Sequence, residues 1–194
     1  MTPAPTTVAI TVAIIGAGPL GRRLALHAAR AGFRVILEDV MPASLRHAEE
    51  TLRQQLGPAG LPLVSFASTI EEAVREADLA IDCVPDELES KLEIFSLLDR
   101  MAPPRTVFAT PTTTLSIADL ASCTYRPDRC VGLAVEAGDL STSSAPNGSS
   151  AAVRIPIRIT TRTSIQAQDL VAGFWRSLGC DPAIEFDPAE PQFR

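Results

Sequence analysis

A continuous run of mostly β-branched residues, Val8–Ile15 (VAITVAII), leads directly into the glycine-rich turn Gly16–Gly21 (GAGPLG). A continuous run of β-branched and small apolar residues predicts a strand that is buried on both faces, as in a parallel sheet. Small and apolar residues then recur at helical spacing up to Gly32, where the helix is expected to end. This sequence of strand, turn and helix is the feature that most strongly predicts an α/β fold.

The turn also carries a chemical signal, because its three glycines have the spacing GxGxxG. Gly16 permits the tight turn, Gly18 lets the backbone approach a pyrophosphate, and Gly21 lets the helix pack close to the strand. The unpaired amides at the start of the helix attract phosphates. The turn therefore predicts dinucleotide binding.

A carboxylate at the end of the second strand supports this interpretation. Arg34–Asp39 (RVILED) is predicted to be that strand, and Asp39 stands where such folds place the residue that binds ribose. A carboxylate repels a 2′-phosphate, and no basic residue follows before Arg46. The sequence therefore favours NAD over NADP.

Strand and helix patterns alternate along the rest of the chain, which predicts a parallel sheet with crossover helices in a single domain spanning 1–194. Two helix starts have the pattern of a capping box, at Ser68–Glu71 and Thr163–Gln166. Residues 1–7 are expected to be a flexible N-terminus, and the Ser-rich segment 139–152 a flexible loop. The other expected strands are Leu63–Phe66, Asp78–Val84, Thr106–Ala109, Arg129–Val135, Val153–Thr160 and Ala183–Phe186.

Composition excludes several classes of protein. The formal charge of −6 argues against a nucleic-acid partner, and no apolar run approaches the ~20 residues that span a bilayer. The first seven residues carry no basic side chain, so they do not resemble a signal peptide. The four cysteines match no zinc or CxxC pattern, which predicts reduced thiols in a cytoplasmic protein without a bound metal.

Longer segments resemble one family. Gly16–Asp39 (GAGPLGRRLALHAARAGFRVILED) resembles the pattern GAGxMGxxIAxxxAxxGxxVxLxD. Glu71–Lys91 (EEAVREADLAIDCVPDELESK) is similar to the stretch that follows the family's third strand. From about Val12 to Leu133 the chain resembles the NAD-binding domain of 3-hydroxyacyl-CoA dehydrogenases. The resemblance implies a doubly wound sheet of the Rossmann type that binds NAD across its carboxyl edge.

The resemblance also implies roles for individual residues. Lys91 stands at a cofactor-contacting lysine, although a solvated helix lysine is the alternative interpretation. Thr113 stands at a serine that contacts substrate and nicotinamide, and it is the tentative catalytic residue. The implied cofactor-binding set is Gly16, Gly18, Leu20, Gly21, Asp39, Val84, Pro85, Asp86 and Lys91.

The catalytic positions depart from the family pattern. Ala134 stands at the histidine that acts as general base, and Pro111 replaces an asparagine beside the Thr113 position. The paired glutamate falls between Pro146 and Pro156, where the sequence has no acid. Glu136, two residues from Ala134, is either a replacement carboxylate or an ordinary strand-end or loop residue. The chain also ends at Arg194, where the family continues into a helical substrate domain, so we expect that domain to be missing.

Three functions remain open from the sequence. The first is an NAD(H)-binding protein with lost or much reduced dehydrogenase activity. The second is a short NAD-dependent oxidoreductase that acts on a 3-hydroxyacyl-CoA or a related hydroxy or oxo acid, with Thr113 orienting the carbonyl. The third is a non-catalytic interaction module whose uncovered apolar edge forms a homodimer.

Overall fold

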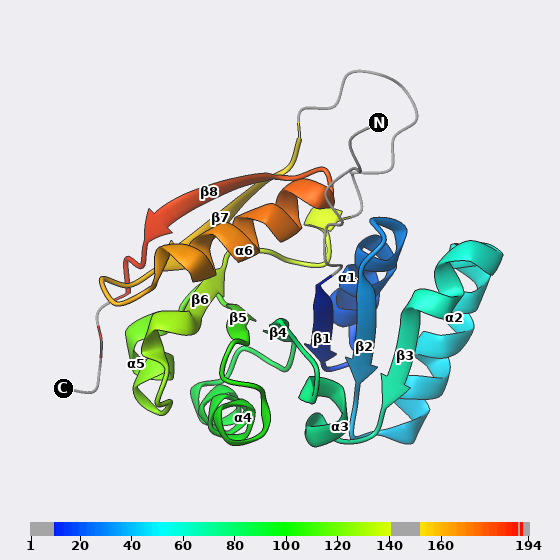
Figure 1. Ribbon diagram of the computed structural model, residues 1–194, viewed down its shortest axis with the longest axis horizontal. Coiled ribbons are helices and arrows are strands. Elements are labelled where there is room, and N and C mark those ends of the chain that lie inside the picture. Colours follow the sequence, from blue (N-terminus) through cyan, green and yellow to red (C-terminus); the bar gives the residue numbers. More distant parts are fainter. Residues whose placement is uncertain (1–9, 141–151, 190, 192–194) are drawn as a thin grey trace, which may run out of the picture.

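The structure, a computed structural model, describes residues 10–140, 152–189 and 191 (Figure 1). Within this part of the chain, eight strands form one sheet in the order β3-β2-β1-β4-β5-β6-β7-β8. The strands are β1 (Thr11–Ile15), β2 (Arg34–Glu38), β3 (Val64–Ala67), β4 (Leu79–Asp82), β5 (Val107–Pro111), β6 (Cys130–Leu133), β7 (Arg154–Ile159) and β8 (Asp181–Phe186).

The sheet is doubly wound, as predicted. Strands β1 to β6 are parallel, β7 runs antiparallel to β6, and β8 runs parallel to β7. The chain winds outward from β1 to β3, returns to β4 on the other side of β1, and then winds the other way. The carboxyl ends of β1 and β4 therefore form a topological switch point, where folds of this kind bind their ligands.

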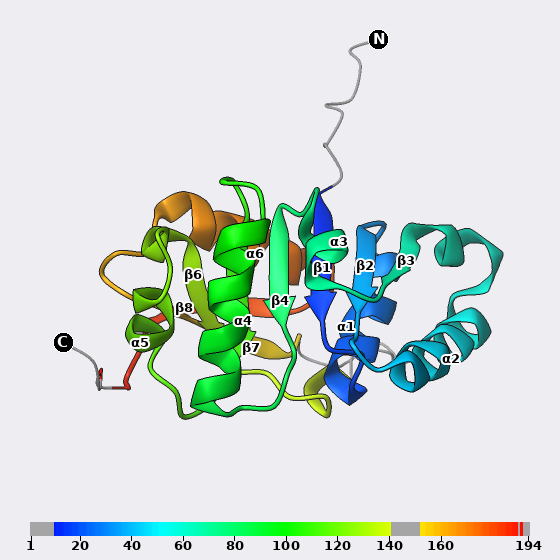
Figure 2. The same cartoon turned by 90° about the horizontal axis from the view of Figure 1, so that it is seen from below.

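Helices cover both faces of the sheet. One face carries α1 (Pro19–Arg30), α2 (Pro42–Gly60) and α6 (Ile165–Ser177), and the other carries α3 (Ile70–Val74), α4 (Leu88–Met101) and α5 (Ile117–Ser122). Figure 2 shows α3, α4 and α5 in front of the sheet. Two short 3₁₀ helices, η1 (Leu61–Leu63) and η2 (Pro127–Arg129), complete the described elements. No described helix has the length and apolar character needed to cross a membrane.

The apolar residues Val12–Ile15 of strand β1 follow one another without alternation because both faces of the sheet are covered. Val12 and Ile14 pack in the core beneath α1, α2 and α6, whereas Ala13 and Ile15 pack in the core beneath α3, α4 and α5. Successive side chains of a strand point to opposite faces, and here both faces are covered. All five residues of the strand are therefore buried.

The last two strands are covered on one face only. Ile155, Ile157 and Ile159 of β7 are buried in the core beneath α6, and the residues between them are partly exposed. On the edge strand β8, Ile184 and Phe186 are exposed. The alternating sequence of β7 thus reflects one-sided burial, in contrast to β1.

Both predicted capping boxes are one residue too early. The residue that caps α3 is Thr69, whose hydroxyl accepts the Glu72 amide at 3.3 Å. Ser164 caps α6 in the same way, accepting the Ala167 amide at 3.3 Å. The capping oxygen must reach an amide three residues ahead, and in both turns the second hydroxyl of the pair is in position to do so.

The two segments predicted to be flexible lie mostly outside the described residues. Residues 1–7 and 141–151 belong to the undescribed part of the chain. Asp139 and Leu140, the first residues of the predicted loop, form a 3₁₀-type turn, and Leu140 is buried in the core. The Leu140 side chain therefore packs as a core residue, and the flexibility of the segment stays a prediction.

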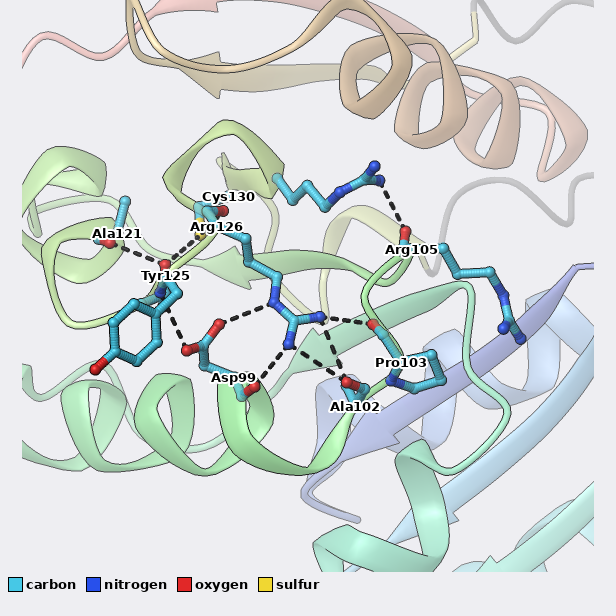
Figure 3. Close-up of polar contacts among 10 residues, drawn as sticks. Asp99, Ala102, Pro103, Arg105, Ala121, Tyr125, Arg126 and Cys130 are labelled. Atoms are coloured by element: carbon cyan, nitrogen blue, oxygen red, sulfur yellow. Dashed lines mark hydrogen bonds and ion pairs between the residues drawn. The ribbon is translucent and has the colours of Figure 1, made fainter.

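One arginine ties the end of α4 to the strands that follow it (Figure 3). The Arg126 guanidinium donates to Asp99 Oδ1 at 2.8 Å, to the Asp99 carbonyl at 2.6 Å and to the Pro103 carbonyl at 2.6 Å. It also lies over the ring of Phe108, 5.2 Å from the centroid. A cation at a helix C-terminus satisfies carbonyls that have no partner within the helix. Arg126 thus stabilises the junction between α4 and β5.

We expect Arg126→Ala to lower the free energy of unfolding by about 3 kcal/mol, because it removes the positively charged partner of the buried Asp99 carboxylate and a hydrogen-bond donor to the carbonyls at the end of α4. Urea denaturation followed by circular dichroism measures this change. The control is Arg129→Ala, which removes one exposed hydrogen bond to the Arg105 carbonyl and should cost at most about 0.5 kcal/mol. If the two variants lost the same free energy of unfolding, the stabilising role given to Arg126 would be contradicted.

Candidate functional site

The glycine turn lies at the switch point, and two of its glycines are required by the fold itself. Gly16 has φ +101°, and its amide donates to the Glu38 carbonyl at 2.8 Å. A Cβ at Gly21 would overlap the Gly16 carbonyl oxygen. These contacts hold β1, β2 and α1 together so closely that side chains larger than hydrogen do not fit.

Gly18 is different, because nothing in the chain requires a glycine there. Its φ of −66° suits any residue, and an added Cβ would meet no atom within 4 Å. Gly18 is the N-cap of α1 and Pro19 follows it, so the open amides at the start of the helix border this empty space. A glycine at this position leaves room for a group from outside the chain.

Asp39 is held at the rim of the turn. Its Oδ2 accepts the Ala17 amide at 2.9 Å, and its Oδ1 accepts the Met41 amide at 2.8 Å. An ionised carboxylate has about four acceptor positions, so both oxygens retain capacity for further donors such as ribose hydroxyls. The contacts fix the carboxylate beside the space in front of Gly18.

A cavity of about 500 Å³ opens in front of the turn, and we call it the cofactor cavity. It brings together residues from the ends of β1, β2 and β4 with apolar side chains from α3 and α4. Five of the nine predicted cofactor-binding residues therefore border one space. Its lining includes Gly16, Gly18, Asp39, Val84 and Pro85 from that set, together with Glu38, Val40, Ile70, Cys83 and Ile94.

Lys91 lies on α4, and its completely buried side chain reaches the end of β4. Its Nζ donates to Asp82 Oδ2 at 3.2 Å, to Thr110 Oγ1 at 2.9 Å and to the Val84 carbonyl at 3.3 Å. The Thr110 hydroxyl also donates to Asp82 Oδ2, at 3.1 Å. Burial raises the pKa of Asp82, and the adjacent ammonium opposes that shift.

This arrangement shows that the solvated interpretation of Lys91 is wrong. All three ammonium protons have acceptors within the protein, and none of the side chain is exposed. Lys91 therefore orders the backbone at Val84, a residue that lines the cofactor cavity. Its direct contact with a cofactor stays a prediction.

A second cavity of about 360 Å³ lies on the other side of Val84, and we call it the reaction cavity. Thr113 is exposed there, and its amide donates to Asp86 Oδ2 at 3.3 Å. The neighbouring Thr112 is buried, and its hydroxyl donates to the same oxygen at 3.0 Å. Asp86 thus fixes the turn after β5. Leu20, another residue of the predicted cofactor-binding set, also lines this cavity.

The segment after β6 forms the far wall of the reaction cavity. Val135, Glu136 and Ala137 line it, and Glu136 is exposed. Ala134, at the position of the family histidine, is held by the bond from its amide to the Pro156 carbonyl at 3.0 Å. A carboxylate and threonine hydroxyls therefore face this cavity, and neither histidine of the chain lines it.

A third cavity, which the sequence did not indicate, lies between α1 and α2 and has a volume of about 390 Å³. We call it the arginine cavity, because Arg22, Arg23 and Arg30 line it together with His27. Burial and the charges of Arg30 and Arg23 lower the pKa of His27. Helical spacing places these residues on one face of α1, which is the signal that could have revealed them.

Glu38 is the other residue that sequence reasoning missed. It lies at the end of a strand whose apolar pattern predicts burial, and the sequence alone does not distinguish it from an exposed acid beside Asp39. It is 5% exposed and lines the cofactor cavity. Burial, and secondarily the Asp39 carboxylate, raises the pKa of Glu38 to about 7. No group of three or more metal-ligating side chains is clustered among the described residues.

Comparison with known proteins identifies relatives of this domain. The family model for the 3-hydroxyacyl-CoA dehydrogenase NAD-binding domain matches residues 11–134. A probable 3-hydroxybutyryl-CoA dehydrogenase of Bacillus subtilis is 33% identical over 135 residues, which cover 63% of this chain and 47% of the relative. A 5-formyl-3-hydroxy-2-methylpyridine 4-carboxylate 5-dehydrogenase of Mesorhizobium japonicum is also 33% identical, over 63% of this chain and 43% of the relative.

Solved structures show the same fold. The (S)-3-hydroxybutyryl-CoA dehydrogenase of Ralstonia eutropha superposes with a TM-score of 0.80 at 20% identity, over 92% of this chain and 64% of that chain. The chain spans about half the length of the curated relatives it matches.

The pKa of Glu38 predicts a pH-dependent stability. Its folded value of about 7 lies above the ordinary 4.5, so burying the ionised carboxylate costs free energy that grows between these values and is complete above pH 7. We therefore expect the melting temperature of Glu38→Gln, relative to wild type, to be about 4 °C higher at pH 8 than at pH 5. In Glu71→Gln, which removes an exposed charge, the difference should not vary with pH. If the melting-temperature difference between Glu38→Gln and wild type were the same at both pH values, the raised pKa of Glu38 would be contradicted.

Proposed function

The chain belongs to the family of the 3-hydroxyacyl-CoA dehydrogenase NAD-binding domain, and we propose that it acts as an NAD(H)-binding protein with lost or much reduced dehydrogenase activity. The observation that carries the proposal is Gly18. Its backbone conformation and surroundings would accept a larger residue, so the glycine is explained by the close approach of a pyrophosphate. The amides at the start of α1 would bind that group.

The same residues would orient the two ends of the cofactor. Asp39, fixed by the amides of Ala17 and Met41, would accept the hydroxyls of the adenosine ribose. Its charge disfavours the 2′-phosphate of NADP, and Val40 and Met41 beside it are apolar. Val84, which lines both the cofactor cavity and the reaction cavity, would lie against the middle of the cofactor.

The proposal of reduced activity rests on the reaction cavity. Bound NAD(H) supplies hydride transfer at its nicotinamide ring. Oxidation of an alcohol also needs a base to remove the hydroxyl proton, and such a base contributes about 10²–10⁴-fold. Ala134 has no ionisable group, and the two histidines of the chain, His27 and His47, lie on α1 and α2.

A second candidate function is oxidoreduction of an acyl-CoA, and the arginine cavity favours it. Three guanidinium groups in a chain of net charge −6 are suited to the phosphates of a coenzyme A. Arg23 also donates to the Ala137 carbonyl, which joins this cavity to the wall of the reaction cavity. In this alternative Thr113 would orient the carbonyl and Glu136 would act as the base.

For the first proposal we expect wild type to bind NADH and Gly18→Ala to bind it at least about tenfold more weakly, since the added methyl group occupies the space of the pyrophosphate. Isothermal titration calorimetry measures both affinities. The matched control is Gly173→Ala on α6, where an added Cβ also meets nothing within 4 Å. Failure of wild type to bind NADH would refute the proposed function.

For the second candidate we expect coenzyme A to bind, and Arg30→Gln to weaken it about tenfold through loss of a charged hydrogen bond. Arg162→Gln, in the exposed turn before α6, is the control and should not change the affinity. NADH oxidation with acetoacetyl-CoA that Thr113→Val abolishes would favour this candidate over the first. Coenzyme A affinities that are equal in both variants would argue against the arginine cavity as its site.

A further inference from the structure

Glu38 is an acid in a row of apolar side chains. It ends β2, and in the sheet register Ile15 of β1 and Ala67 of β3 are its neighbours on either side. Both neighbours belong to the core beneath α3 and α4. The Glu38 side chain is therefore on that face of the sheet, at the floor of the cofactor cavity.

The Glu38 carboxyl faces the cavity without a partner. Its side chain makes no hydrogen bond or ion pair with the rest of the described chain. The one fully buried side-chain nitrogen or oxygen that lacks a partner among these residues is the indole nitrogen of Trp175. The carboxyl oxygens of Glu38 therefore retain accessible surface, and the open space beside them is the cofactor cavity.

The surroundings of Glu38 offer no compensating positive charge. Asp39, next to it in the chain, is the charged group that acts on it, and it repels a second negative charge. The thiol of Cys83, on the same cavity wall, stays neutral because burial raises its pKa. The surrounding elements present the apolar side chains of Ile15, Ala67, Ile70 and Ile94. The acids Glu71 and Glu72 of α3 and Glu93 of α4 are exposed.

We propose that Glu38 recognises the adenine of NAD(H) in its protonated form, so that cofactor binding is coupled to the uptake of a proton. This inference rests on the proposed function, because it takes NAD(H) as the occupant of the cofactor cavity. It makes Glu38 a specificity-determining residue at a position that the family pattern GAGxMGxxIAxxxAxxGxxVxLxD leaves open.

The chemistry of the two partners supports this role. A protonated carboxyl group has one O–H donor and a carbonyl acceptor. Adenine offers the complementary pair on one edge, with a ring-nitrogen acceptor next to the 6-amino donor. An ionised carboxylate only accepts, so it would face the lone pair of the ring nitrogen. It would also add a negative charge close to Asp39 and to the phosphates of the cofactor.

The experiment is a calorimetric titration of the full chain with NADH between pH 6 and pH 8. Because the pKa of Glu38 is about 7, we expect the dissociation constant to rise about tenfold over this range. At pH 7, titrations in two buffers of different ionisation enthalpy should show uptake of about half a proton per NADH. ADP-ribose, which carries the adenine half alone, should show the same proton uptake.

Glu38→Gln replaces the acid by a neutral group of the same shape that also donates and accepts. We expect this variant to bind NADH with an affinity that is constant from pH 6 to pH 8, without proton uptake. Glu71→Gln removes one exposed negative charge from the neighbouring helix α3 and should behave like wild type. If Glu38→Gln fails to fold, the proton uptake of wild type with NADH and ADP-ribose still decides the question.

The possible failures are distinguishable. If NADH binds at no pH, the proposed function fails, and this inference fails with it. If NADH binds with a pH-independent affinity and no proton uptake, the proposed function stands and the role of Glu38 is refuted. The same conclusion follows if Glu38→Gln retains the pH dependence of wild type, or if proton uptake occurs with NADH but not with ADP-ribose.

Discussion

The buried ion pair between Lys91 and Asp82 is the interaction on which both halves of the site depend. It joins α4 to the ends of β4 and β5, because Thr110 of β5 bonds to both charges. Two charges in a dry interior are stable only when paired and fully hydrogen-bonded. The ammonium also holds the carbonyl of Val84, the residue that lines the cofactor cavity on one side and the reaction cavity on the other.

The two cavities differ in what they retain of a dehydrogenase. The cofactor cavity has an open space before Gly18 and a fixed carboxylate at Asp39, which together suit a dinucleotide. In the reaction cavity the turn after β5 is held by Asp86, and the segment after β6 contributes an exposed Glu136 and no histidine. The cavity that would hold the cofactor thus follows the family more closely than the cavity where chemistry would occur.

Local patterns predicted the fold and part of the site. The apolar run before Gly16 and the alternation of β7 correspond to strands buried on two faces and on one face. Gly16, Gly18 and Asp39 border one cavity, and their contacts with a cofactor stay a prediction. The predicted helix caps were one residue before the observed ones, Thr69 and Ser164. Two adjacent hydroxyl residues differ only in which backbone amide each can reach, and the sequence does not show that.

By itself the sequence determined the order of strands and helices and the glycine turn. The periodicity of apolar residues, the residues that cap helices and the conformational freedom of glycine depend on residues close together in the chain, so they can be recognised in the sequence. Only the tertiary structure decided which charges are buried and which partners they find. It paired Lys91 with Asp82, nine residues away, and left Glu38 unpaired on the floor of a cavity. The free energy of a buried charge depends on residues that the fold brings together from several elements, and no local pattern contains that information.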